Sequence, residues 1–471
     1  MMILSSLSTL STITVLSIIL PFSVQPAMAA NDSAQRPPTA AKELYLPKKI
    51  DRVPDNNDYT SNDSEYSFKR MVQGDNIAIF WSREYGDDPM SNPNAKKRFH
   101  PAQSLAECER FYEHYVNELK MVLKGQSLTD RYKMLVIVFG GDGGTAYGGG
   151  SDDKIGVLWT PAVRINKKPY GALAHEMAHC FQYISRIDSG HGPGGAIMEM
   201  SAQYMLWQVY PEWMTFEHYH LVDFLKQTHY AFLHPINMYH SPYVLEYWSN
   251  KHGKEFFGIL SRSTEPGEDP VMTYKRLNGL GQDQFNDEMF DACRRFITWD
   301  MKRIAAVAKP YANQHSCTLQ DIGDGWYRIA PAKCPQNYGY NGIKLTVPAA
   351  GTTVGLTFKG IAGAEGYPAV KTDKAGWRYG FVASLKDGSR VYGQTYKDSE
   401  GSASFQVPEK TDYLWLVVMG APTEHWPIAG RRRARTENTA EEQWPYQIQL
   451  AGTGLDASVI QSIPSKAEQG K

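Results

Sequence analysis

The residues of this chain best suited to chemistry are His175, Glu176 and His179, which form the pattern H-E-x-x-H. In an α-helix, positions i and i+4 lie one above the other on the same face, so both imidazoles can bind one metal ion. Glu176 lies about 100° further round the helix, where its carboxylate can reach a metal-bound water without binding the metal. The pattern predicts a zinc ion bound by the two histidines, with Glu176 as general base.

The flanking residues predict a helix around this motif. Apolar residues recur at spacings of three and four from Tyr170 to Ile184, so one stripe of the helix is buried while the histidines line a cleft. Glycines and a proline between positions 190 and 195 then end the helix and form a loop.

A second predicted helix, at 196–207, offers the third metal ligand. It carries Glu199 among apolar neighbours, where a carboxylate is costly unless it is paired or bound to metal. Glu199 is therefore the preferred third ligand. His191 and Asp188 are alternatives in the loop region, and a site without a third protein ligand also stays open.

An H-E-x-x-H motif followed by a helical glutamate resembles the gluzincin clan of zinc metallopeptidases. Nineteen residues separate His179 from Glu199, as in thermolysin-like members, and the string Gly195-Ala196-Ile197-Met198-Glu199 resembles their G-A-I-x-E. Gln182 resembles the H-E-x-G-H-x-x-Q variant of the enhancin-like branch. Thermolysin relatives place an aspartate where this chain has Gln203, so the group that orients the first histidine must differ.

The resemblance implies a secreted zinc peptidase that cleaves proteins, peptides or glycoproteins. Such chemistry needs a donor for the oxyanion, which this clan takes from the helical half that follows the motif. The polar, aromatic segment before a helix predicted to start at Pro242 supplies three candidates, Tyr239, His240 and Tyr243.

Strands and helices before the motif give the order expected of a gluzincin-like catalytic domain with a mixed sheet and a helical half. We predict strands at 77–81, 134–139 and 155–159 and a helix at 104–123. The resemblance implies that the strand at 155–159 is the sheet edge that pairs with an extended substrate. The glycine-rich stretch 140–150 is predicted as a loop, either at the surface or over the cleft with Tyr147 touching substrate.

The N-terminus predicts export. Residues 1–30 carry no Asp, Glu, Lys or Arg, 13–24 form an apolar core, and Ala27-Met28-Ala29 is an A-x-A cleavage site. We therefore expect a signal peptide at 1–29, an extended lead-in at 30–60 and a secreted or periplasmic protein. No other segment is apolar and long enough to span a membrane.

The expected fold class is α+β, with a catalytic domain at 61–313 and an antiparallel β-sandwich at 314–456. Evenly spaced alternating strands predict the sandwich, which is a candidate for binding glycan or protein, and 457–471 is expected to be a flexible tail. Cys317 and Cys334 are close enough in sequence to form one disulfide bridge. The run Arg431–Arg435 is interpreted as a solvated loop.

A net charge of −1 argues against general affinity for nucleic acid. Two other functions remain open beside the zinc peptidase. One is an exported glycan- or protein-binding protein with a structural or vestigial zinc site, and the other is a zinc hydrolase that does not act on peptides.

Overall fold

The computed structural model describes residues 41–428 and 441–461. The predicted signal peptide, the first part of the lead-in, the arginine run and the last part of the tail lie outside the described residues. The helices are α1 (Pro101–Asn117), α2 (Gly171–Ser189), α3 (Ile197–Val209), α4 (Trp213–Phe216), α5 (His218–Lys226), α6 (Tyr243–His252), α7 (Phe256–Arg262), α8 (Pro270–Asn278), α9 (Gln282–Phe296) and α10 (Ala305–Ala308). The strands are β1 (Met71–Gln73), β2 (Ile77–Trp81), β3 (Met134–Phe139), β4 (Tyr147–Ser151), β5 (Ile155–Pro161), β6 (Leu319–Gly323), β7 (Trp326–Ile329), β8 (Tyr340–Leu345), β9 (Thr353–Gly360), β10 (Trp377–Leu385), β11 (Arg390–Tyr392), β12 (Glu400–Gln406), β13 (Thr411–Gly420), β14 (Tyr446–Ala451) and β15 (Ile460–Gln461).

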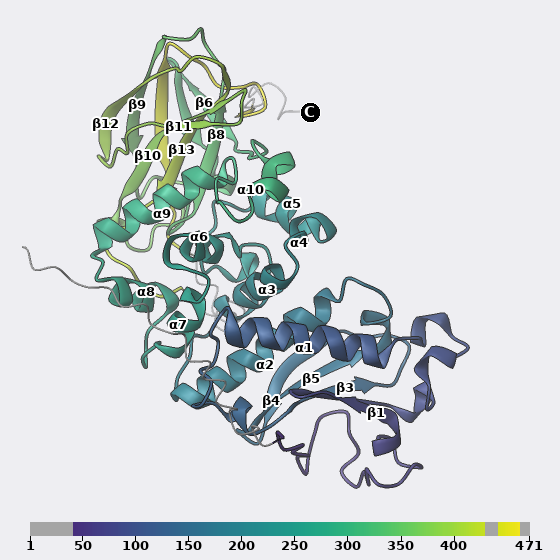
Figure 1. The fold of residues 1–471 in the computed structure, drawn as a ribbon. Coiled ribbons are helices and arrows are strands. Elements are labelled where there is room, and N and C mark those ends of the chain that lie inside the picture. The colour runs from purple at the N-terminus through teal and green to yellow at the C-terminus, as the bar shows by residue number, and fades with distance from the viewer. Residues whose placement is uncertain (1–40, 429–440, 462–471) are drawn as a thin grey trace, which may run out of the picture. The chain divides into compact units, whose positions relative to one another are not determined.

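Residues 71–161 build a five-stranded mixed sheet in the order β1-β2-β3-β5-β4. Strands β2, β3 and β5 run parallel, while β1 and β4 pair antiparallel at the two edges. Helices α1 and α2 pack on one face (Figure 1). This mixture of sheets and helices confirms the predicted α+β class.

Both faces of this sheet are buried, which explains the nearly continuous apolar runs of its central strands. Alternate residues such as Ile79 and Val136 join the core under α1 and α2. Their neighbours, such as Phe80 and Ile137, pack on the opposite face against the lead-in, which contributes Ile50. The described part of the lead-in is therefore a cover for the sheet.

The glycine-rich stretch is not wholly a loop, because 147–151 form the edge strand β4, which pairs with β5. The prediction that 155–159 is the edge is therefore wrong. Tyr147 does not project from a loop: its ring stacks on Trp159 at a centroid distance of 5.0 Å. A Cβ at Gly148 would overlap the carbonyl oxygen of Glu176, and one at Gly150 would overlap the Tyr183 ring. Glycine is needed here because β4 lies directly against α2.

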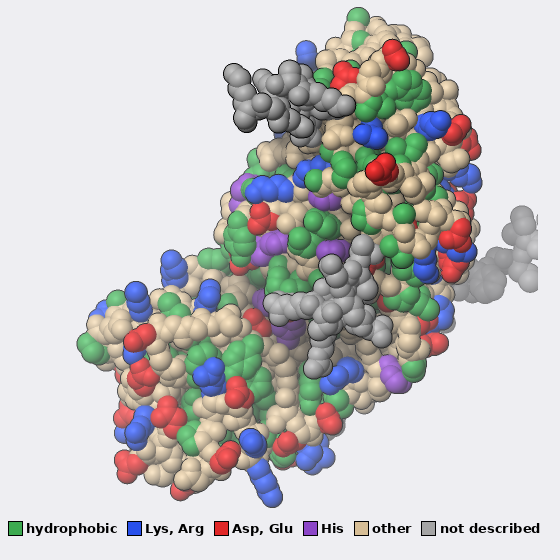
Figure 2. All heavy atoms as spheres, turned by 180° about the vertical axis from the view of Figure 1, so that it is seen from behind, with side chains coloured by type: hydrophobic (Ala, Val, Ile, Leu, Met, Phe, Trp, Pro, Cys, Tyr) green, Lys and Arg blue, Asp and Glu red, His purple; other side chains and the backbone are tan. Residues whose placement is uncertain are grey.

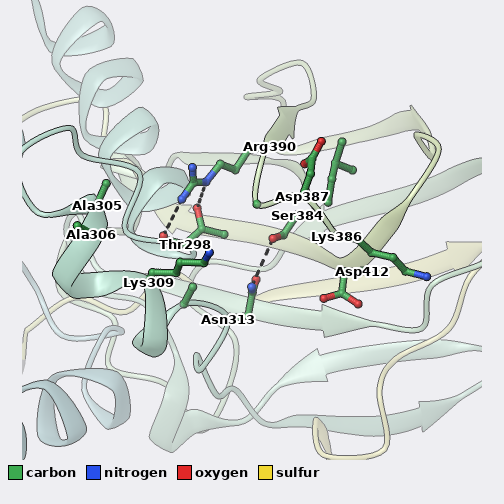
Figure 3. Close-up of a pocket in the computed structure, with 13 residues that line it drawn as sticks. Thr298, Ala305, Ala306, Lys309, Asn313, Ser384, Lys386, Asp387, Arg390 and Asp412 are labelled. Carbon is green, nitrogen blue, oxygen red and sulfur yellow. Dashed lines mark hydrogen bonds between the residues drawn. The ribbon is translucent and has the colours of Figure 1, made fainter.

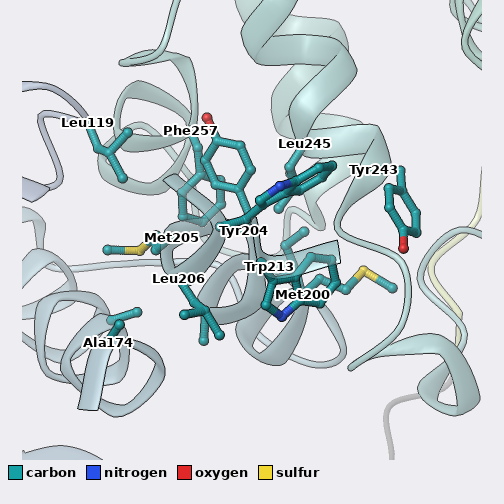
Figure 4. Packing of buried hydrophobic residues seen from close by; sticks show 14 of the residues in the cluster. Leu119, Ala174, Met200, Tyr204, Met205, Leu206, Trp213, Tyr243, Leu245 and Phe257 are labelled. Carbon is teal, nitrogen blue, oxygen red and sulfur yellow. The ribbon is translucent and has the colours of Figure 1, made fainter. Parts of the chain in front are cut away.

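Helix α3 is the most enclosed element near the motif, since nearly all of its residues from Met200 to Val209 are buried. Figure 4 shows its side chains packed between those of α2 and of later helices, with Ala174, Leu206 and Phe257 as examples. Glu199 and Gln203 are thus carried by a helix that packing holds rigidly.

The last third of the described chain forms two further sheets, in the orders β11-β10-β13-β8 and β12-β9-β14-β7-β6-β15. All pairs are antiparallel except β6 with β15. Side chains of both sheets, among them Leu416 and Phe358, share one hydrophobic cluster. The alternate face of β13 carries Val417 and Met419 into the core with α9. Ile460 and Gln461, expected in a flexible tail, instead form β15.

The predicted bridge between Cys317 and Cys334 is not formed, and all five cysteines of the chain are buried free thiols. Cys317 and Cys334 both lie inside the cluster shared by the two C-terminal sheets. A thiol in such a place packs as a small apolar group. The described residues contain no helix long and apolar enough to cross a membrane.

The close approach of β4 to α2 makes a testable prediction. Gly148→Ala should lower the free energy of unfolding by about 1–3 kcal/mol, because the new methyl group forces the strand away from the helix. Gly149→Ala is the matched control, since its Cβ would meet nothing within 4 Å. Urea unfolding of both variants checks this, and equal stability of the two would contradict the packing described.

Candidate metal centre

Helices α2 and α3 bring three of the predicted site residues to one point. Nε2 of His175 and Nε2 of His179 each lie 3.2 Å from Oε2 of Glu199. The side chains are 12%, 15% and 22% exposed respectively, so the cluster is mostly shielded from water. The i, i+4 spacing on α2 sets the two imidazoles, and the first turn of α3 supplies the carboxylate.

Glu176 lies beside this cluster. Ligand atoms of His175, Glu176 and His179 all lie within 4.8 Å of one another. The backbone N–H of Gly148 lies near enough to the Glu176 carboxylate to favour its ionised form and lower its pKa. Strand β4 therefore positions Glu176 as well as packing against its helix.

Gln182, one turn after His179, fixes the proton on that histidine. The amide nitrogen of Gln182 donates to the carbonyl of Met198 over 2.8 Å and to Ser201 Oγ over 2.9 Å. Because a carbonyl can only accept, the amide oxygen must face His179, where it lies 2.8 Å from Nδ1. Nδ1 of His179 is therefore the protonated nitrogen, and Nε2 presents a lone pair to Glu199.

Gln203 orients His175 in the same manner and extends the network to α5. Its Oε1 lies 3.3 Å from Nδ1 of His175, and its Nε2 lies 2.9 Å from Nε2 of His220. Nδ1 of His220 in turn lies 2.8 Å from Nδ1 of His240. A consistent assignment has each group donate to the next: His175 to Gln203, Gln203 to His220 and His220 to His240.

This proton assignment has an electrostatic consequence. Two imidazole lone pairs and a carboxylate oxygen repel one another at 3.2 Å unless positive charge lies between them. Protonating both rings would satisfy Glu199 but would bury two adjacent cations. One divalent cation satisfies all three atoms. Around a tetrahedral zinc ion with bonds of about 2.0–2.1 Å, neighbouring ligand atoms lie about 3.3 Å apart, so the donor set and its spacing fit zinc.

The charges of the cluster shift its pKa values. Burial alone would raise the pKa of Glu199, but its contacts with His175 and His179 hold that pKa well below its usual range. Burial would lower the pKa of His179, yet Glu199 outweighs this effect and raises it. Burial raises the pKa of Glu176, although the charges of both histidines and the nearby backbone N–H of Gly148 act to lower it.

Of the three oxyanion candidates, the structure brings Tyr239 closest to the cluster. Its ring lies 6.2 Å from that of His175, nearly parallel to it. His240 reaches the cluster only through His220 and Gln203. Tyr243 is not brought there: it is fully buried and packs against Trp207 and Trp299.

The alternative ligands are not brought to the cluster either. Asp188 accepts a hydrogen bond from the backbone of Leu128 at the far end of α2. His191 lies exposed in the loop after that helix, and no contact of its side chain with the cluster is seen in the described residues.

Two residues of the site were not singled out from the sequence. His220 closes the hydrogen-bond chain from His175, and Glu217 lines a cavity with His175 and Glu176. The sequence signal for both is weak: polar residues near the start of an aromatic-rich helix. Their importance comes from tertiary contacts alone.

Cavities lie on both sides of the cluster. One cavity, of about 310 Å³, is lined by His179, by β4 and by the loop at 192–194 that follows α2. The other, of about 300 Å³, is lined by His175 and Glu176 and by residues of α5. Histidine side chains gather midway along the face shown in Figure 2. A third cavity, of about 470 Å³, lies elsewhere, between the α10 region and the turn after β10 (Figure 3). Its lining residues in the described part of the chain include no histidine or cysteine.

Residues 37–457 match the model of the family of unknown function DUF6055, and the chain belongs to that family. No curated protein matches the chain. The site must therefore be interpreted from its own geometry.

The buried histidine of α5 predicts a pH dependence of stability. Burial, together with the charges of His240 and His175, lowers the pKa of His220 to about 3. As the pH falls below about 6.5, His220 becomes protonated in the unfolded chain but stays neutral in the folded chain. The free energy of unfolding therefore decreases as the pH falls below about 6.5.

Replacing this histidine by a neutral amide should remove that loss. Between pH 7 and pH 5, His220→Gln should lose about 1–2 kcal/mol less free energy of unfolding than the wild type. Urea unfolding at both pH values measures the difference. Identical pH dependence in the two proteins would show that His220 titrates normally.

Proposed function

We propose that this protein is an exported zinc-dependent peptidase related to the gluzincin clan. His175, His179 and Glu199 would hold the metal, and Glu176 would be the general base. We also propose the predicted division into a catalytic domain at 61–313 and a β-sandwich at 314–456, which is a candidate for binding glycan or protein. Substrates would be proteins, peptides or glycoproteins.

The observation that carries the proposal is the meeting of two histidine nitrogens at one carboxylate oxygen, each 3.2 Å away. Both nitrogens are the ones left without a proton, because Gln182 and Gln203 engage the other side of each ring. A structural zinc site normally has four protein ligands. Three ligands with a flanking carboxylate favour the hydrolytic arrangement.

When bound, zinc supplies a Lewis acid that polarises a carbonyl and makes water more acidic. Glu176 would remove the proton from the attacking water and later deliver it to the leaving amine. Its place supports this role, because its carboxylate lies within 4.8 Å of the ligand atoms of both histidines. Tyr239 is the best placed of the candidate donors to the oxyanion.

Strand β4 supports binding of an extended peptide. It is one edge of the five-stranded sheet, and it packs against α2, the helix that carries the motif. Gly148 of β4 and His179 of α2 line the same cavity. A substrate strand added there would form backbone hydrogen bonds next to the cluster. The glycines leave room for such a close approach, as the open space at Gly149 indicates.

Metal content and turnover test the proposal together. The purified protein should contain about one zinc per chain, measured by elemental mass spectrometry, and His179→Ala and Glu199→Ala should lose it. Glu176→Gln should retain zinc and cleave casein-derived peptides at least about 100-fold more slowly, because a general base contributes roughly 10²–10⁴-fold.

Each failure has a separate meaning. Zinc retained by Glu199→Ala would exclude Glu199 as an essential ligand. Normal cleavage by Glu176→Gln would exclude it as the base. Zinc without cleavage of any peptide would instead favour the exported binding protein or another zinc hydrolase.

A further inference from the structure

Glu217 lies at the end of α4, in the wall of the cavity that opens beside His175 and Glu176. Residues from four parts of the chain line this cavity: Gly171, Ala172, His175, Glu176, Gln203, Leu206, Glu217, Tyr219, His220 and Tyr239. Its volume of about 300 Å³ suits one side chain of a substrate rather than a whole peptide. A group bound there would lie next to the reacting bond of the proposed peptidase.

The carboxylate of Glu217 is largely buried without a positive partner. Its side chain is 24% exposed, and no Lys or Arg of the described chain lies within 4 Å of it. Trp213 Nε1 donates to Oε2 over 2.6 Å, and His220 Nε2 lies 3.6 Å away. His220 does not supply the missing charge, because its Nε2 accepts from Gln203 and the ring is neutral.

A carboxylate in this position has a cost that its own fold does not offset. Burying an ion without a counter-ion is unfavourable, and burial indeed raises the pKa of Glu217. By contrast, Glu246 in the core of this protein is paired with Arg303. The free charge of Glu217 faces the cavity, so its counter-ion is expected from outside the chain.

The walls of the cavity leave a path to that charge. Gly171 adds no side chain between the cluster and Glu217; a Cβ there would lie only 3.3 Å from Oε1. Ala172 is the next residue along the same wall. Tyr219 also lines the cavity; the residue is 57% exposed, and its ring can pack on an aliphatic stem. The combination suits a long side chain that ends in a cation.

We propose that this cavity is a specificity pocket in which Glu217 binds a positively charged group of the residue next to the cleaved bond. The proposal rests on the proposed peptidase function for the position of that bond. The cation is either the side chain of a lysine or arginine or a free amino terminus, which share the same chemistry.

Binding to a protein that cannot turn over tests the pocket without relying on activity. The zinc-loaded Glu176→Gln protein is titrated by calorimetry with acetylated, amidated hexapeptides that carry one lysine at each position in turn. Matched peptides carry norleucine instead. At one position lysine should bind about 10–100-fold more tightly, since a hydrogen bond to a charged group contributes about 1.5–3 kcal/mol, a range that corresponds to this factor.

Glu217→Gln, added to the same background, should remove this preference, because glutamine keeps the acceptor for Trp213 but loses the charge. Glu217→Asp should retain part of it. Glu212→Gln is the matched control, an exposed glutamate of the same segment, and should keep the full preference. Two results would overturn the pocket. One is a preference for lysine that persists in Glu217→Gln. The other is equal affinity for lysine and norleucine peptides at every position, together with equal affinity for free and acetylated peptides.

Peptides with a free amino terminus form the second arm. If removal of the acetyl group gives the Glu217-dependent gain and lysine gives none, the cation is the amino terminus and the enzyme is an aminopeptidase. Cleavage by the wild type without any charge preference would overturn the pocket and leave the peptidase standing. Charge-selective, Glu217-dependent binding without cleavage of any peptide would support the pocket and overturn the peptidase.

Discussion

The constraint on which the site depends is that two imidazole lone pairs and a carboxylate meet in a shielded place. Such a meeting is stable only when positive charge lies between the three groups. The surrounding residues fix the orientation of the two rings and of the carboxylate. Gln182 and Gln203 hold the histidine rings from behind. Helix α3 is buried from Met200 to Val209, and this packing keeps the backbone that carries Glu199 in place.

Helix α2 can carry this set because it is held from two directions. On one side β4 approaches so closely that only glycine fits at Gly148, and the backbone N–H of that glycine lowers the pKa of Glu176. On the other side α3 packs against it, with side-chain contacts that involve His175, His179 and Gln182. The strand that lies beside Glu176 is also one of the two edges of the sheet. Packing, positioning of Glu176 and the proposed binding of an extended substrate therefore depend on one short glycine-rich segment.

Much of this arrangement was predictable from sequence because it follows from local periodicity. The helical repeat places His175 and His179 on one face, and the apolar runs of β2, β3 and β5 mark buried strands. The glycine-rich strand was missed because glycine has low strand propensity, and its pairing is determined by the neighbouring helix and not by its own residues. The roles of Glu217 and His220 were missed because they arise where α4 and α5 fold back on α2. The spacing of residues along the sequence does not predict such a tertiary contact.

The use of two glutamines to orient the histidines has a consequence for the proposed chemistry. A carboxylate behind a metal-binding histidine makes that ligand more basic and adds negative charge to the site. Neutral amides at Gln182 and Gln203 do neither, so a bound zinc ion would keep more of its positive charge and act as a stronger Lewis acid. Weaker electron donation from the ligands would also reduce metal affinity, which the rigid packing of α2 and α3 partly offsets by removing the cost of ordering the ligands.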